Sequence, residues 1–173
     1  MSLLSDQIRL ILDNSFQKNK EKFFHKDKEK CFQNNEEKSP QKNEEESLQK
    51  NEEESLQRNE KNYYARLVFD DEFIGFQGHF PGQPVLPGIV MIQTLQLMCE
   101  KITGKNARLQ SIKDSRFMVP VFPNQLVTLV ATLPRRKKAE GTLVKGIFYN
   151  GHGKEEKIVA KISILLDMEG DLA

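Results

Sequence analysis

The longest apolar segment of the chain covers residues 87–102 and carries apolar side chains on nearly every face of a helical projection. At 1.5 Å per residue this segment predicts a helix about 22 Å long. The Thr103-Gly104 pair that follows is a typical helix C-terminal signal. A helix that is apolar all round has to be surrounded by other elements. We therefore expect this helix at the centre of the core.

Short runs with a β-type pattern flank this segment. Ala65, Leu67 and Phe69 alternate with polar positions, and a turn signal at residues 70–71 precedes a second run at residues 73–76. Because no second long helix is available to cover the first, an antiparallel sheet has to curl around it, which predicts an α+β domain over residues 63–173. Further strands are predicted over residues 109–117, 126–133, 143–149 and 157–166.

The beginning of the chain has the spacing of an amphipathic helix. Its apolar side chains fall on one face, and Ser2 or Ser5 can cap the first turn. We expect a short helix over residues 1–13, docked on the globular part through Leu4, Ile8, Ile11 and Leu12.

Residues 14–62 form a polar octapeptide-repeat insertion, with units such as NEEESLQK at residues 43–50 and NEEESLQR at residues 51–58. Eight residues advance the position around a helix by about 80°, so the few apolar side chains form no continuous stripe. A flexible or partly helical spacer is the favoured interpretation, and a specific binding arm is the alternative. The apolar side chains of the tract are Phe16, Phe23, Phe24, Cys31, Phe32, Leu48 and Leu56.

The charges nearly cancel: 26 Lys and Arg against 25 Asp and Glu give a net charge of +1. This balance argues against nucleic acid as a partner. No apolar run reaches the roughly 18 residues that span a bilayer, and the start of the chain does not resemble a signal peptide. We therefore expect a cytoplasmic protein without membrane insertion. Cys31 and Cys99 suggest neither a disulfide framework nor a metal site, and we expect both to be reduced, with Cys99 in the core.

Candidate chemistry is concentrated just before the apolar helix, in the segment FQGHFPGQPVLPG at residues 76–88. Three prolines and three glycines constrain its backbone and place His79 on a path that leads into a helix N-terminus. A lone histidine is more often structural or merely exposed than catalytic. The surrounding segment makes His79 the best candidate for a catalytic base.

This segment resembles the active-site motif of the 3-hydroxyacyl-acyl-carrier-protein dehydratases, hot-dog fold enzymes of fatty acid synthesis. Their pattern, Gly-His-Phe-Pro-Gly-x-Pro-Val-x-Pro-Gly, is met at every fixed position of residues 78–88. A second block, IKDSRFMVPVFPNQL at residues 112–126, resembles the strand and turn that follow the central helix of the family. The similarity covers roughly residues 73–167 and implies a hot-dog fold, in which a curled antiparallel sheet wraps around one long helix.

The resemblance implies that His79 removes a proton from C2 of a 3-hydroxyacyl thioester and that the backbone N–H of Gly88 polarises the thioester carbonyl. The family places Glu or Asp at the position that protonates the leaving hydroxyl, and this chain has Gln93. An amide cannot donate a proton at neutral pH. Two alternatives remain open: His79 moves the proton itself, or a carboxylate such as Asp114 reaches the site from a neighbouring strand.

The resemblance also implies partners. The substrate would be carried as a phosphopantetheine thioester on acyl carrier protein, with no other cofactor, by a homodimer that shares each active site between subunits. A basic turn at residues 135–138 is the candidate carrier contact or, alternatively, a solvated hairpin tip; its residues are Arg135, Arg136, Lys137 and Lys138. The implied substrate-binding residues are Phe80, Pro81, Val85, Pro87, Ile89 and Phe117.

Three functions are compatible with these residues. The leading hypothesis is a dehydratase-like enzyme of fatty acid, polyene or related lipid biosynthesis. The second is a non-catalytic, acyl-binding hot-dog subunit that pairs with an active partner. The third is an acyl thioesterase, which ranks lowest because such enzymes usually place a carboxylate on the central helix, where this chain has Gln93. The Pro-His-Arg-Tyr-Pro type of segment that the family carries near its N-terminus is absent, so the acyl chain length is left open.

Overall fold

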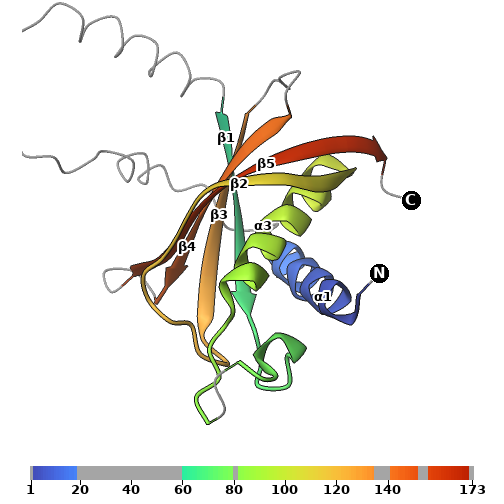
Figure 1. The fold of residues 1–173 in the computed structure, drawn as a ribbon. Helices are drawn as coiled ribbons and strands as arrows, with labels where there is room; N and C mark the ends of the chain where they lie inside the picture. The colour runs from blue at the N-terminus through green and yellow to red at the C-terminus, as the bar shows by residue number, and fades with distance from the viewer. Residues whose placement is uncertain (1, 19–59, 80–81, 135–140, 152–155, 172–173) are drawn as a thin grey trace, which may run out of the picture.

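The computed structural model describes residues 2–18, 60–79, 82–134, 141–151 and 156–171 of the 173-residue chain. Its centre is helix α3 (Gly88–Thr103), which lies in the concave face of a curved sheet (Figure 1). Gly104 adopts a left-handed backbone with φ 67° and ends the helix, as the sequence predicts.

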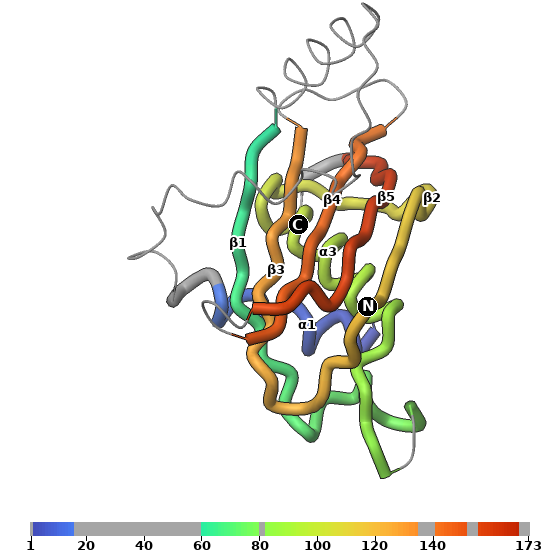
Figure 2. The backbone as a smooth tube through the Cα atoms, turned by 90° about the vertical axis from the view of Figure 1, so that its left-hand side faces the viewer, coloured from blue at the N-terminus to red at the C-terminus, as the bar shows by residue number. Residues whose placement is uncertain are grey.

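The sheet has five antiparallel strands in the order β1-β3-β4-β5-β2, and Figure 2 shows them side by side with the helices behind. The register of β2 shifts at three places against β5, which is typical of a strand that bends around a helix. Strands β1 and β2 form the two edges. The strands are β1 (Glu60–Val68), β2 (Lys105–Phe117), β3 (Leu126–Pro134), β4 (Thr142–Asn150) and β5 (Lys157–Asp171).

The helix sits close to the sheet at Gly146 of β4. A β-carbon at that position would lie 2.7 Å from Cδ2 of Leu95, whose side chain is fully buried. Glycine therefore provides the space in which the middle of α3 packs against the strand. These contacts confirm the predicted α+β fold, a curled antiparallel sheet around one long apolar helix.

Helix α1 (Leu3–Lys18) lies on the same side of the sheet as α3 (Figures 1 and 2). Ile8 and Leu12 are fully buried, which confirms that the amphipathic helix docks on the core. Ser2 caps the helix, because its Oγ accepts a hydrogen bond of 3.3 Å from the Ser5 N–H.

The predicted end of this first helix, at residue 13, is wrong. The helix continues to Lys18 because Ser15 also docks: its side chain is buried, and its Oγ accepts a hydrogen bond of 2.7 Å from the backbone N–H of Arg66 on edge strand β1. At the other end of the repeat insertion, β1 begins at Glu60, three residues before the predicted start at 63. The insertion between them falls outside the described residues, and Cys31 with it.

The predicted strand at residues 73–76 is also wrong, because residues Ile74–Phe76 form the 3₁₀ turn η1. In a strand, the side chains of Phe73 and Phe76 would point to opposite faces. The turn places positions i and i+3 on one side, so both rings are buried together, with centroids 5.7 Å apart. The ring of Phe73 also packs against that of Phe69, with the two ring centroids 5.0 Å apart, so the three rings form a small aromatic cluster.

Candidate active site

His79 lies on the loop between η1 and α3, with a half-buried side chain. Its Nδ1 is 2.8 Å from the backbone carbonyl oxygen of Val85. Because a carbonyl oxygen only accepts hydrogen bonds, Nδ1 carries the proton in this contact. In the neutral ring, the lone pair that can take up a proton is then on Nε2. The sequence predicted His79, but not the carbonyl that fixes its tautomer.

The loop that carries His79 is held at both ends. Gly78 and Gly82 have φ values of 74° and 85°, which residues with a β-carbon rarely adopt. At the far end, buried Leu86 donates its N–H to the carbonyl oxygen of Val121 at 2.8 Å. The glycines of the motif thus set the backbone path, and the buried leucine anchors it to the core.

Gly88 is the first residue of α3. Pro87 precedes it without a side-chain cap, and the Pro87 carbonyl accepts the N–H groups of Val90 and Met91. The N–H of Gly88 has no partner within the helix, so it is a donor at the positive end of the helix dipole. A β-carbon on Gly88 would lie 2.7 Å from Cζ of Phe117. A side chain at position 88 would therefore displace the Phe117 ring from the place it occupies here.

Gln93 lies in the second turn of α3, and its side chain contacts α1. Its Nε2 donates a hydrogen bond of 2.7 Å to Oγ of Ser5. The sequence indicated Ser5 only as a possible helix cap, because the register between two helices so distant along the chain leaves no signal in either one. Ser5 is thus a hydrogen-bond partner of the predicted site residue Gln93 that sequence analysis missed.

Asp114 lies on β2, at one of the register shifts of that strand. Its side chain is 53% exposed, and its Oδ2 lies 3.4 Å from Nε of Arg116. The carboxylate is therefore a surface group paired with a neighbouring arginine. No group of three or more potential metal ligands occurs among the residues that the structure describes.

The other predicted site residues divide into three groups: half-buried, exposed, and outside the described residues. Val85 and Pro87 are half-buried, whereas Ile89 is 60% and Phe117 47% exposed. The exposed apolar residues near the start of α3, on β2 and just after β2 include Ile89, Ile112, Phe117, Met118 and Phe122. Outside the described residues lie Phe80, Pro81, Arg135, Arg136, Lys137 and Lys138.

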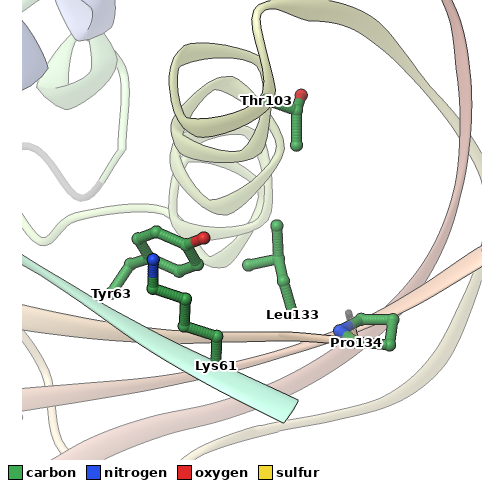
Figure 3. A pocket seen from close by; sticks show the side chains of 5 residues that line it. All are labelled: Lys61, Tyr63, Thr103, Leu133 and Pro134. Carbon is green, nitrogen blue, oxygen red and sulfur yellow. The ribbon is translucent and has the colours of Figure 1, made fainter. Parts of the chain in front are cut away.

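A cavity of about 420 Å³ lies near the C-terminal end of α3 (Figure 3), at the other end of the helix from Gly88. Two of its lining residues contact each other, with the Nζ of Lys61 lying 5.0 Å from the centroid of the Tyr63 ring. None of the predicted site residues that the structure describes lines this cavity, and His79 is not among its lining residues. Its lining residues are Lys61, Tyr63, Thr103, Leu133 and Pro134.

Within the described ranges, no helix has the length and apolar character that crossing a bilayer requires.

Comparison with known proteins places these features in a family. Residues 54–145 match the family model described as "ApeI-like: ApeI dehydratase". A 3-hydroxyacyl-[acyl-carrier-protein] dehydratase FabZ of Lactiplantibacillus plantarum is 39% identical over 75 residues, which cover 39% of this chain and 51% of that protein. The protein of the same name from Clostridium acetobutylicum is 31% identical over 111 residues, covering 60% of this chain and 74% of the relative.

The chain spans about half the length of the first curated relatives that it matches, 51% and 55%. Among solved structures, an uncharacterized protein from Erwinia carotovora subsp. atroseptica superposes with a TM-score of 0.54 at 22% identity, over 64% of this chain and 86% of that one. At this identity the likeness concerns the fold. Together the matches confirm the resemblance predicted from residues 78–88: the chain belongs to the ApeI-like dehydratase family, with the hot-dog fold.

Proposed function

We propose that the protein is a dehydratase that reversibly removes water from a 3-hydroxyacyl thioester in fatty acid or related lipid biosynthesis. The observation that carries the proposal is the hydrogen bond from His79 Nδ1 to the Val85 carbonyl, on the loop that leads into the N-terminus of α3. It leaves Nε2 as the basic atom of the neutral ring. Family membership supports the reaction class.

The first half of the reaction uses two groups. His79 Nε2 takes the proton from C2, and the electron pair of the broken C–H bond moves toward the thioester carbonyl. The enolate oxygen then accepts a hydrogen bond from the Gly88 N–H, whose position at the helix N-terminus favours negative charge.

The second half breaks the C3–O bond, and the enolate electron pair forms the C2–C3 double bond. The departing hydroxyl needs a proton, which the amide of Gln93 cannot supply. We propose that His79 returns the proton it took from C2, so that one water leaves and the imidazole is regenerated. The pairing of exposed Asp114 with Arg116 favours this route over an acid on β2.

We further propose that the substrate arrives on acyl carrier protein and that the enzyme is a homodimer. Ser15 of helix α1 accepts a hydrogen bond from the backbone N–H of Arg66, so α1 covers part of the β1 edge. The opposite edge strand, β2, exposes Ile112 and Phe117. An uncovered strand edge with apolar side chains is suited to pairing with a second copy. The basic residues 135–138 stay a prediction for the carrier contact.

Turnover tests the proposal directly. The full chain is mixed with a 3-hydroxyacyl carrier-protein thioester, and enoyl formation is followed by ultraviolet absorbance. His79→Ala is expected to lower kcat by about 10²- to 10⁴-fold, while Asp114→Asn leaves it unchanged. Circular dichroism of both variants confirms that they fold. A large loss in Asp114→Asn would show that a carboxylate on β2 is the acid and would overturn the single-base route.

The alternative function is a non-catalytic acyl-binding subunit, and the observation that favours it is Gln93 in place of an acid, with its amide bonded to Ser5. Gln93→Glu separates the two functions. If a missing acid limits the rate, this variant gains up to roughly two orders of magnitude in kcat. No enoyl formation by either protein, with acyl-thioester binding intact, would establish the binding function. Release of free thiol in the same assay would reveal a thioesterase.

A further inference from the structure

The side chain of Gln93 is the start of a short chain of hydrogen bonds on α1. Its Nε2 donates to Ser5 Oγ at 2.7 Å, and Ser5 Oγ lies 2.9 Å from Ser2 Oγ. Ser2 Oγ also accepts the backbone N–H of Ser5 at 3.3 Å, as the cap of the helix.

The contact with Ser5 fixes the orientation of the amide. Either hydroxyl of the Ser2–Ser5 pair can be the donor, and in both cases Ser5 Oγ keeps a lone pair for a further hydrogen bond. Gln93 Nε2 donates to Ser5 Oγ, so the amide presents its NH₂ group to α1. Because the two ends of an amide differ, fixing Nε2 on this side fixes the acceptor Oε1 on the other.

Ser5 is held firmly enough to impose this orientation. Ile8, on the next turn of α1, is fully buried. Arg9 Nη2 donates to Oε2 of Glu100 on α3 at 2.6 Å, and Glu100 is itself buried. Two residues on the C-terminal side of Ser5 therefore hold α1 in place, Ile8 by burial in the core and Arg9 by its ion pair with α3.

We infer that Ser5 is a positioning residue that holds Gln93 with Oε1 directed to the 3-hydroxyl group of the substrate. In this orientation Gln93 accepts the hydroxyl proton in a hydrogen bond, so the site recognises 3-hydroxyacyl groups in preference to saturated ones. The inference rests on the proposed function, because it assigns this substrate to the site. Ser5 itself lies outside the segment of residues 54–145 that matches the family.

The contact is tested first without any ligand. In ¹⁵N spectra of the full chain, the side-chain amide signal of Gln93 is identified by its loss in Gln93→Ala. Ser5→Ala is expected to shift this signal and to speed its hydrogen exchange. Asp13→Ala is the matched control, since it removes the α1 partner of Lys101 on α3 and leaves Ser5 in place. An unchanged Gln93 signal in Ser5→Ala would overturn the inference, whatever reaction the protein catalyses.

Substrate recognition is tested by binding. Dissociation constants are measured for a 3-hydroxyacyl pantetheine thioester and for the saturated thioester of equal length. Ser5→Ala is expected to raise the dissociation constant of the 3-hydroxyacyl ligand roughly three- to tenfold, the range of one hydrogen bond, and to leave that of the saturated ligand unchanged. Ser5→Thr keeps the hydroxyl and should keep the preference. Gln93→Ala should cause the same loss, and the double variant no further loss.

The outcomes separate the two proposals. Equal weakening of both ligands in Ser5→Ala, or an unchanged preference, would reduce Ser5 to a structural residue and overturn the inference. A wild-type protein that prefers the 3-hydroxyacyl ligand through Ser5 but forms no enoyl product would support the inference and overturn the proposed dehydratase activity.

Discussion

At the scale of single residues, Gly88 joins packing to chemistry. Its Cα lies so close to the Phe117 ring that an added β-carbon would be 2.7 Å from Cζ. Gly88→Ala is expected to displace this ring. Because Phe117 is 47% exposed, the ring can move outward, and the free energy of unfolding should fall by only about 1 kcal/mol, the low end for overpacking. The same variant should also lower kcat, because the substitution disturbs the helix N-terminus that carries the Gly88 N–H.

The measurements are urea unfolding and kcat. Phe117→Leu combined with Gly88→Ala is the matched rescue, because the smaller side chain leaves room for the β-carbon. If the single and double variants unfold at the same urea concentration, the ring contact does not determine the need for glycine.

The thiol of Cys99 is predicted to be unreactive toward alkylating reagents in the folded protein. Burial, with a smaller contribution from the charge of Glu100, raises the pKa of its thiol from 9.0 to about 12. The unfolded chain therefore loses this proton at lower pH than the folded chain, so the free energy of unfolding falls as the pH rises above 9. In a Cys31→Ser chain, iodoacetamide at pH 9 should label Cys99 only after urea is added. Rapid labelling without urea would contradict the buried position.

At the scale of elements, two ion pairs between described residues join α1 to α3, one buried and one exposed. We expect them to contribute differently to the free energy of unfolding. Oε1 of buried Glu100 also accepts the N–H of Ala107 at 3.1 Å, and Oε2 accepts Arg9. Arg9→Ala leaves a buried carboxylate short of a partner and should lower the free energy of unfolding by about 1–3 kcal/mol. Lys101→Ala breaks the exposed pair with Asp13 and should cost about 0–1 kcal/mol. Equal losses in urea unfolding would show that the buried pair has no special role.

Sequence analysis succeeded for elements whose pattern is complete in one segment. The helix over residues 87–102 combines all-round apolarity with a glycine stop, and the structure places it at Gly88–Thr103. It failed for residues 73–76, because Phe73 and Phe76, three positions apart, are compatible with either a strand or a turn. Only the packing of Phe73 against Phe69 in the structure distinguishes the two. The end of α1 was missed because Ser15 is polar and is buried only through its bond to β1.

For the candidate site, too, the sequence is informative only where the pattern is local. The motif at residues 78–88 singles out His79 and Gly88 as candidates, because its prolines and glycines lie in one short segment. The contact of Gln93 with Ser5 joins residues 88 positions apart. The sequence pattern of either helix carries no information on how α1 and α3 align, so Ser5 is recognised as the partner of Gln93 only from the packing of the two helices.

At the scale of the whole molecule, the proposed dimer depends on the β2 edge. Ile112→Lys places a charge on this edge and is expected to convert the dimer to a monomer, which light scattering after gel filtration would measure. Leu143→Lys is the matched control, because Leu143 is 43% and Ile112 45% exposed, yet Leu143 lies on β4, inside the sheet. A wild-type monomer at micromolar concentration, or a dimer lost equally in both variants, would contradict pairing along β2.

The docking of α1 has a consequence for the length of the insertion. Residues 19–59 connect a helix and a strand whose positions are both fixed by the core, so the insertion closes a loop. For the flexible spacer that the repeats predict, the entropy of closure grows only with the logarithm of loop length. One more octapeptide would then lower the free energy of unfolding by about 0.2 kcal/mol. The number of repeats is therefore nearly neutral for stability, and copies can be gained or lost while Ser5 keeps its place beside Gln93.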